Sequence, residues 1–176
     1  MIVKHATQVG NPIIRSKAKS VKNITSKETK KIIKDLVDSM HYHALVGMAA
    51  PQIGKSLRVF VTEIRQTKNR KPKDLDPIRV FINPEITYYS KKVALGYEGC
   101  GSVASSELFG KVPRSESIVI KAYNEKGEPF EFTAQGLLAR VIQHEQDHIE
   151  GKVFLDRITD TESFMSRNEY RAKFKK

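Results

Sequence analysis

The stretch QHEQDH at residues 143–148 decides how the rest of this 176-residue sequence is interpreted. It contains a His-Glu-x-x-His pattern, in which two histidines four positions apart lie on one face of a helix, one turn from each other. Both imidazoles can then reach a single Zn²⁺ or Fe²⁺ ion. The side chain of Glu145 projects to the side, where it can serve a water molecule at the metal rather than the metal itself. The stretch therefore predicts a metal site built on a helix.

The residues before this stretch predict the helix that carries it. Leu137, Val141, His144 and His148 are spaced by four, three and four positions, so the histidines continue an apolar stripe. Such a stripe faces the interior of a globular protein. We therefore expect a buried helix over about 135–150.

The other regular elements point to an α+β fold. A Thr25-initiated amphipathic helix is expected over about 26–43, near the N-terminus, with its basic face in water. Alternating and β-branched residues predict two strands and a hairpin further along the chain. Because strands and helices are segregated along the chain, we expect small antiparallel or mixed β-sheets packed around the central His-Glu-x-x-His helix. The expected strands cover 57–61 and 78–82, with a stop at Asn83-Pro84 and a polar loop over 65–76 between them; the hairpin turns at 124–127.

Length and composition limit the class of protein. One domain over residues 1–176 is expected, with 160–176 as a basic C-terminal tail or short helix. Apolar residues make up 39% and charged residues 29%, which is typical of a globular protein. No apolar run approaches the ~18 residues of a spanning helix, so membrane insertion is not expected. The single cysteine and the lack of a secretory leader favour a reducing, cytoplasmic location.

The net charge admits two interpretations. There are 31 basic and 20 acidic residues, and 31 − 20 gives +11. Such an excess is typical of proteins with an anionic partner, such as RNA or a phospholipid surface. Scattered lysines that only keep the protein in solution explain it equally well.

The third metal ligand distinguishes between enzyme classes. In metzincin-type peptidases a glycine and then a third histidine follow the motif; here Gly151 fits, but Phe154 stands where the histidine is needed. Thermolysin-like enzymes use a downstream glutamate, and Glu169 is the candidate in the polar tail. The remaining candidate is Cys100, whose thiolate would be a strong ligand and which has a glycine on each side. A lone cysteine is, however, more often a small buried hydrophobic residue.

Three motifs together resemble those of one known family. GMAAPQIG at residues 47–54, EGCGS at 98–102 and QHEQDH at 143–148 are similar, in order and spacing, to the three signature motifs of the peptide deformylases. The resemblance extends over nearly the whole chain. It implies a metal-dependent hydrolase that removes the N-formyl group from the N-terminal formylmethionine of newly synthesised bacterial or organellar proteins.

The resemblance implies a metal centre and a general base. Cys100, His144 and His148 would hold one divalent ion. Fe²⁺ is the first candidate, and Zn²⁺ or Ni²⁺ can occupy the same site. Metal-bound hydroxide would attack the formyl carbon, and Glu145 would act as general base and then as general acid. No further cofactor is implied.

The resemblance also implies how the transition state and the substrate are bound. The side-chain amide of Gln52 and the backbone N–H of Gly101 would stabilise the oxyanion. An ion pair between Glu98 and Arg114 would support the cysteine loop. Substrate would bind along four residues, with methionine in an apolar pocket: Val46, Gly47, Leu137 and Val141.

The sequence departs from the family pattern at four places. Leu45 stands where the first motif has a glycine, and Gly101 where a leucine follows the cysteine. Phe109 stands roughly at the place of an arginine, and residues 103–106 lack a proline. These departures keep open a diverged deformylase-like metalloprotein with weak or altered activity.

The expected partners follow from the same resemblance. They are nascent formyl-Met polypeptides and, through the basic tail, the ribosome surface. A non-catalytic ribosome- or RNA-binding protein is the alternative from a different class, supported by charge alone. The basic residues of the tail are Arg167, Arg171, Lys173, Lys175 and Lys176.

Overall fold

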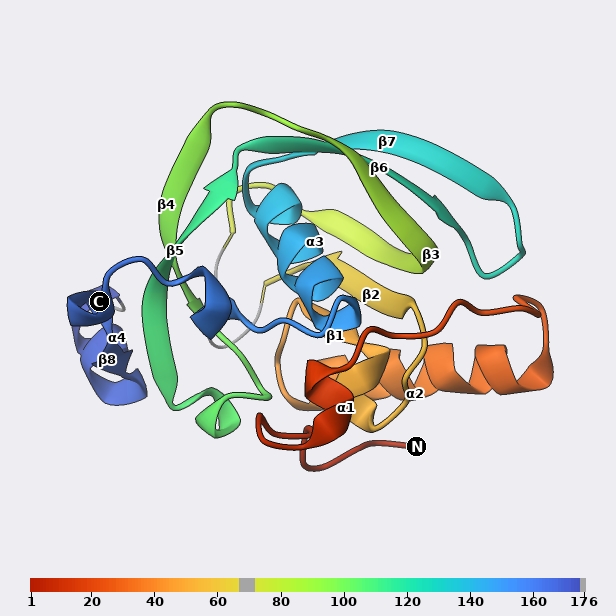
Figure 1. Ribbon diagram of the computed structural model, residues 1–176, viewed down its shortest axis with the longest axis horizontal. Coiled ribbons are helices and arrows are strands. Elements are labelled where there is room, and N and C mark those ends of the chain that lie inside the picture. Colours follow the sequence, from red (N-terminus) through yellow and green to blue (C-terminus); the bar gives the residue numbers. More distant parts are fainter. Residues whose placement is uncertain (67–71, 175–176) are drawn as a thin grey trace.

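Two antiparallel sheets enclose one central helix in the computed structural model, which describes residues 1–66 and 72–174 (Figure 1). The larger sheet has the strand order β1-β2-β3-β6-β7 and the smaller one β4-β5-β8. This is the α+β fold expected from the sequence. The strands are β1 (Gly47–Ala49), β2 (Val59–Ile64), β3 (Asp76–Tyr89), β4 (Val93–Gly99), β5 (Leu108–Ser115), β6 (Ser117–Tyr123), β7 (Pro129–Gln135) and β8 (Met165–Ser166). The α-helices are α1 (Pro12–Arg15), α2 (Lys27–Tyr42), α3 (Gly136–Ile149) and α4 (Arg167–Phe174), and short 3₁₀ turns include η2 (Ala104–Ser106) and η3 (Phe154–Arg157).

The central helix is α3, which carries the QHEQDH stretch. Ala139, Ile142 and Ile149 on α3 are fully buried and belong to the core formed with the larger sheet. In that core the rings of Phe60 and Phe81 stack at 4.7 Å between centroids. The apolar stripe seen in the sequence is therefore the face by which α3 is fixed in the interior.

Helix α2 covers the β1 end of the larger sheet. Its residues Ile32, Leu36 and Met40 are buried in a second apolar cluster with residues of β1 and β2. The helix is capped by Ser26, whose hydroxyl accepts the backbone N–H of Thr29 at 3.1 Å. The sequence had suggested Thr25 as the cap, so that assignment was wrong by one position.

Strand β3 continues through Asn83-Pro84, where the sequence predicted a stop. The register with β6 shifts between Ile82 and Glu85, so the proline lies in a bulge where the ladder is interrupted anyway. Asn83 adopts a left-handed backbone (φ 50°), and its side chain bonds both backbone groups of Val21. The bulge bends the long strand without ending it.

The smaller sheet was not foreseen. Gly96, Gly99, Gly110 and Pro113 lie within β4 and β5, and these residues have low intrinsic strand propensity. Two of the glycines are required by packing, because a Cβ at Gly99 would come within 2.7 Å of the Phe109 ring and one at Gly110 equally close to Ile158.

The other expected elements are located as follows. The hairpin is confirmed: β6 and β7 flank a turn in which the Asn124 side chain accepts two backbone N–H groups. The C-terminal segment forms β8 and then α4. The polar loop over 65–76 lies partly outside the described residues. Among the helices that the structure describes, none is both long and apolar enough to cross a bilayer.

Gly151, which directly follows the helix terminus, offers a test of how α3 is held. Its φ is +74°, and a Cβ there would lie 2.7 Å from the backbone oxygen of Arg15. Gly136, at the other end of α3, has φ +57° but open space around it. Gly136→Ala should lower the free energy of unfolding by about 1–2 kcal/mol through backbone strain alone. Gly151→Ala should lower it by roughly 1–3 kcal/mol more because the backbone must also shift.

Chemical denaturation of the two variants checks this prediction. Equal losses of stability would contradict the close approach of the α1 segment to the end of α3.

Candidate metal centre

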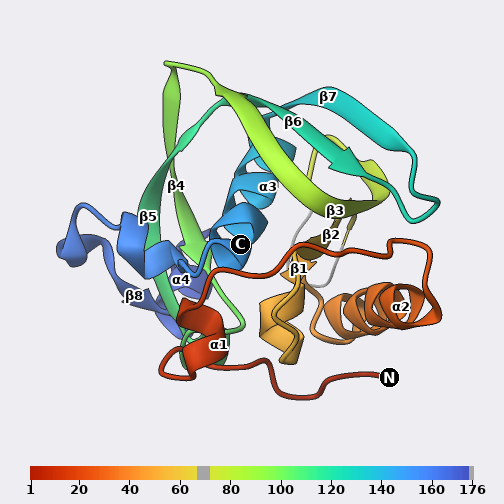
Figure 2. The same ribbon diagram turned by 45° about the vertical axis from the view of Figure 1, so that its right-hand side comes forward.

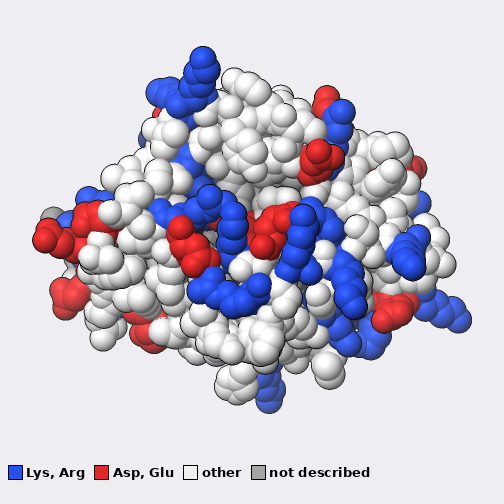
Figure 3. All heavy atoms as spheres, viewed as in Figure 1, with Lys and Arg blue, Asp and Glu red and all other residues white. Residues whose placement is uncertain are grey.

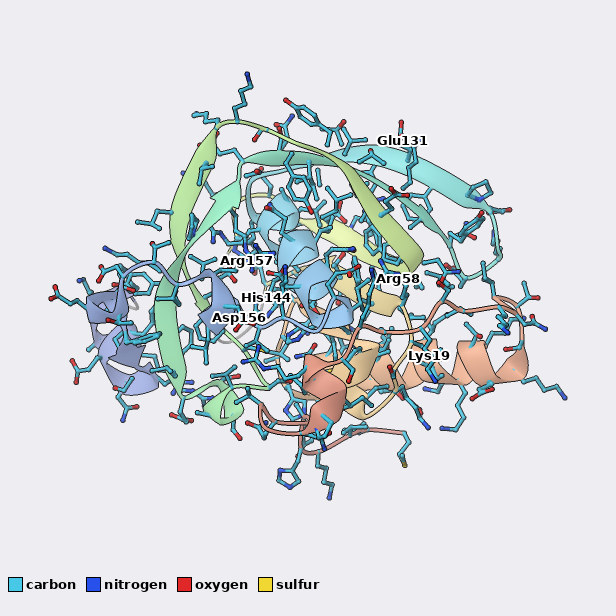
Figure 4. All side chains as sticks on the ribbon, viewed as in Figure 1. Lys19, Arg58, Glu131, His144, Asp156 and Arg157 are labelled. Carbon is cyan, nitrogen blue, oxygen red and sulfur yellow. The ribbon has the colours of Figure 1, made fainter. Side chains whose placement is uncertain are left out.

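Three metal-binding side chains meet between the sheets. Cys100 follows the end of β4, and His144 and His148 lie on α3. Figure 4 labels His144 on this helix. One ligand atom from each side chain lies within 4.8 Å of the others. The Sγ of Cys100 is 3.1 Å from Nε2 of His148. Cysteine and histidines 44 or more positions apart in sequence are thus brought to one point.

The histidine rings are oriented so that their Nε2 atoms serve this point. Nδ1 of His144 bonds to the Glu98 carboxylate at 2.9 Å, which leaves Nε2 for a metal. For His148, Nε2 faces Cys100, and Nδ1 has no hydrogen-bond partner among the described residues. A thiolate and two imidazoles suit Zn²⁺, Fe²⁺ or Ni²⁺. The residues therefore fit a divalent transition metal.

The surroundings of Cys100 favour its thiolate. Burial raises the pKa of the thiol, but the charge of His148 and hydrogen bonds with both histidines lower it by more than burial raises it. The net pKa therefore lies well below the ordinary value. The backbone N–H of Ser102 also donates to Sγ at 3.3 Å. The cysteine is thus prepared as a ligand, since the thiolate is the form that binds metals.

A buried carboxylate, Glu98, bonds to His144 and to two arginines next to the metal-binding group. It accepts hydrogen bonds from Arg114 at 3.0 Å, from Arg140 at 2.8 Å and from His144. The ion pair between Glu98 and Arg114 expected from the sequence is confirmed. Burial raises the pKa of Glu98, but the hydrogen bonds from His144 and Arg114 outweigh burial and hold it well below the ordinary value. Glu98 therefore stays ionised and fixes the orientation of His144.

The charge network continues away from the metal ligands. Arg114 also bonds Asp147 at 2.6 Å, and Asp147 bonds Arg157 of η3 at 2.6 Å. Sequence reasoning missed Arg140, Asp147 and Arg157. Arg140 could have been found, because it lies four positions before His144 and therefore on the same face of α3.

Glu145 lies beside the ligands and is buried with them. It is 3% exposed, and its Oε2 has no hydrogen-bond partner within the described part of the chain. Burial raises the pKa of Glu145 to about 7. Gly47 of β1 makes room for it, since a Cβ there would overlap Oε1 of Glu145 and approach Val141 to 2.8 Å. A carboxyl group with a pKa near neutrality can both take and give a proton.

Gln52 directs its amide group at the same point. Its Oε1 accepts the backbone N–H of Ala49 at 2.8 Å, which turns Nε2 towards Cys100 Sγ, 3.7 Å away. Gly101, next to the cysteine, has its carbonyl held by the Gln8 side chain at 2.8 Å. Both positions named from the sequence therefore border the centre.

A cleft of about 430 Å³ opens from this centre to the surface. All four residues expected to bind substrate line it: Val46, Gly47, Leu137 and Val141. A second group lines it from the smaller sheet and the C-terminal helix: Tyr97, Phe109, Arg167, Tyr170, Arg171 and Phe174. Of these, only Phe109 had been placed near the substrate from the sequence, as the residue at the position of a family arginine.

A thiolate and two imidazoles beside a buried carboxyl group, at the base of a cleft, define a metal-dependent hydrolase site. A family model described as polypeptide deformylase matches residues 3–164. The chain belongs to this family, and it is an enzyme of the peptide deformylase type.

Relatives and solved structures agree with this assignment. The peptide deformylase of Pseudothermotoga lettingae is 40% identical over 168 residues, which cover 96% of this chain and 90% of the relative. That of Dictyoglomus thermophilum is 41% identical over 90% of this chain and 95% of its own length. A Met-Ala-Ser-bound class I type b peptide deformylase from Acinetobacter baumannii is 32% identical with a TM-score of 0.82, covering 89% of this chain and 100% of that chain. The Thermotoga maritima enzyme is 34% identical with a TM-score of 0.78, over 89% of this chain and 97% of that one.

The contact between Gly47 and Glu145 yields a prediction about activity. Gly47→Ala should displace the Glu145 carboxylate and, with Glu145 in the general-base role that the resemblance implies, lower kcat by roughly 10²-fold. Metal content should stay near that of the unmodified protein, because neither residue is a ligand. The rate of deformylation and the metal-to-protein ratio are the measurements.

Gly127→Ala is the matched control for a general loss of stability. Its φ of +84° makes the substitution strained, but it lies in the distant β6–β7 turn. Full activity in Gly47→Ala would show that the carboxylate does not depend on the space left by the glycine.

Proposed function

We propose that this protein removes the formyl group from the N-terminal formylmethionine of newly synthesised polypeptides by metal-assisted hydrolysis. The observation that carries the proposal is the Cys100, His144 and His148 group beside the buried carboxyl of Glu145, whose Oε2 has no hydrogen-bond partner in the part of the chain that the structure describes. The Met-Ala-Ser-bound relative supports it, since that peptide begins with methionine.

The proposed metal ligands are Cys100, His144 and His148, with Fe²⁺ as the first candidate and Zn²⁺ or Ni²⁺ as ions that suit the same donors. When bound, a divalent metal supplies a Lewis acid that activates water and polarises the formyl oxygen. Glu98 keeps His144 in the tautomer that presents Nε2.

Glu145 is the proposed proton carrier. Its carboxylate takes a proton from the attacking water as the oxygen–carbon bond forms at the formyl group. It then gives this proton to the methionine nitrogen as the carbon–nitrogen bond breaks, which releases formate and a free amino terminus. Its burial, together with the Oε2 atom that has no hydrogen-bond partner among the described residues, supports both steps.

Gln52 and Gly101 are proposed to bind the oxyanion. The amide group of Gln52 is fixed by Ala49 and faces the centre. The backbone N–H of Gly101 would be the second donor. Each such donor contributes about 10²–10³ in rate in enzymes that use this device.

The substrate is proposed to lie along β1. This strand forms one edge of the larger described sheet, so a peptide can bind along it by backbone hydrogen bonds. The methionine side chain would enter the apolar part of the cleft formed by Val46, Leu137 and Val141, which pack together in one cluster. Backbone recognition of this kind accepts many protein sequences.

Anaerobic purification followed by metal analysis and a formate-release assay tests the proposal. The protein should contain about one divalent metal per chain and hydrolyse formyl-Met-Ala. Cys100→Ala should lose the metal and the activity, whereas Glu145→Gln should retain the metal and lose activity by about 10²–10⁴-fold. Metal without turnover in the unmodified protein would favour the diverged metalloprotein, and neither metal nor turnover would favour a binding protein.

Contact with the ribosome surface is a second proposal, which rests on the net charge of +11. Lys and Arg side chains are spread over the face in Figure 3 with Asp and Glu among them. Arg167 and Arg171 line the cleft, whereas Lys173 is exposed outside it. Cosedimentation with ribosomes should weaken steeply between 50 and 200 mM salt, to the extent that phosphate contacts hold the complex. Binding that is insensitive to salt would contradict this proposal.

A further inference from the structure

The C-terminal helix α4 contributes one wall of the catalytic cleft. It follows β8, which pairs with β5, and both ribbon views place it beside the smaller sheet (Figures 1 and 2). The family match ends at residue 164, so α4 lies beyond it. The residues of α4 that line the cleft are Arg167, Tyr170, Arg171 and Phe174, at positions i, i+3, i+4 and i+7. This spacing is one face of a helix, and that whole face is turned to the cleft.

Aromatic rings connect this face to the metal centre. Phe109 lies directly over Gly99, the neighbour of Cys100, because a Cβ at Gly99 would meet its ring. Tyr170 stacks on Phe109 with centroids 4.3 Å apart and planes 7° apart. The ring of Phe174 follows, with its centroid 5.1 Å from that of Tyr170. The rings thus form a continuous apolar wall from the cysteine loop to the mouth of the cleft.

Arg167 anchors the helix in this position. Its guanidinium donates to the backbone oxygens of Ser105 and Ser106 and pairs with Glu107 at 3.1 Å. Ser105 and Ser106 have left-handed backbones (φ 50° and 65°), so the arginine bonds to a loop in an unusual conformation. The wall is therefore held at both ends, by stacking on Phe109 and by this loop.

We infer that the aromatic face of α4 binds the side chains that follow methionine in the substrate, so that the enzyme favours large apolar or aromatic residues there. This inference rests on the proposed function. An extended peptide advances ~3.3 Å per residue, so rings spaced by 4–6 Å can face two or three successive positions. Phe174 is 49% exposed, and a side chain at the mouth of the cleft can cover it. A substrate with glycine at these positions would leave the rings of the enzyme exposed to water.

Kinetics on formyl-Met-Ala-X peptides with X = Phe, Leu or Gly test the inference, with formyl-Met-Ala as the reference. The unmodified enzyme should have kcat/KM about 3- to 10-fold higher for Phe than for Gly, the range of one aromatic contact. Phe174→Ala and Tyr170→Ala should bring this ratio close to one, mainly through KM. The Phe-to-Gly ratio is taken within each variant and set against that variant's own formyl-Met-Ala turnover, so that a general loss of activity does not alter it.

Asn168→Ala is the matched control, because Asn168 is an exposed residue of α4 that does not line the cleft. It should keep the Phe preference. Tyr170→Phe retains the ring and should keep it too, which separates loss of the wall from loss of the helix.

No turnover of formyl-Met-Ala would overturn the proposed function. Turnover of formyl-Met-Ala with equal rates for Phe and Gly, or a preference that survives both alanine variants, would overturn the inference alone.

Discussion

The buried carboxylate of Glu98 is the interaction on which the rest of the site depends. It lies at the end of β4 and receives Arg114 from β5 together with Arg140 and His144 from α3. One anion therefore joins the three elements that position the metal ligands. Removing one partner of a buried ion pair typically costs about 3–5 kcal/mol, because the remaining charge is left without compensation. Stability and the orientation of the metal-binding histidine thus depend on the same atoms.

The parts of the structure that were predictable from sequence are those encoded by residues close together. The periodicity from Leu137 to His148 placed α3, and the spacing of two histidines placed both imidazoles on one face. The Asn124 turn likewise identified its hairpin. Cys100 was a candidate ligand because of its thiol and the glycine on each side, and the resemblance to a family assigned it, whereas Gln52 was assigned through the resemblance alone.

The parts that were missed depend on contacts between distant residues. The glycines of β4 and β5 lower strand propensity, yet Gly99 and Gly110 are required by side chains that pack over them. By composition, Asn83-Pro84 predicts the end of a strand. In the structure the two residues lie in a bulge, where the side chain of Asn83 bonds to Val21, and the strand continues beyond them. The C-terminal segment was expected to be a basic tail or short helix, and its contact with the cleft was not predicted. Its aromatic residues give it an apolar face only once Phe109 provides a surface to stack on.

Leu45 and Gly101, two of the departures from the family pattern, are neighbours in the structure. The family has a glycine at the first position and a leucine at the second, and here the sizes are exchanged. A Cβ at Gly101 would lie 3.7 Å from Cδ1 of Leu45, so the leucine already borders the space beside the glycine. Both residues line the cleft, so the side chain of Leu45 lies beside the position where Gly101 has none.

Three hydrogen bonds limit the backbone freedom that glycine would otherwise add next to the cysteine. The carbonyl of Gly101 accepts the Gln8 amide, and the backbone N–H of Ser102 donates to Cys100. The carbonyl of Ser102 in turn accepts the N–H of Val9. Flexibility at Gly101, and with it a weakened oxyanion donor, is what the sequence alone suggests. Because the N-terminal segment holds the carbonyls of Gly101 and Ser102, directly after the Gly101 N–H, the exchange of glycine and leucine does not by itself imply a weaker enzyme.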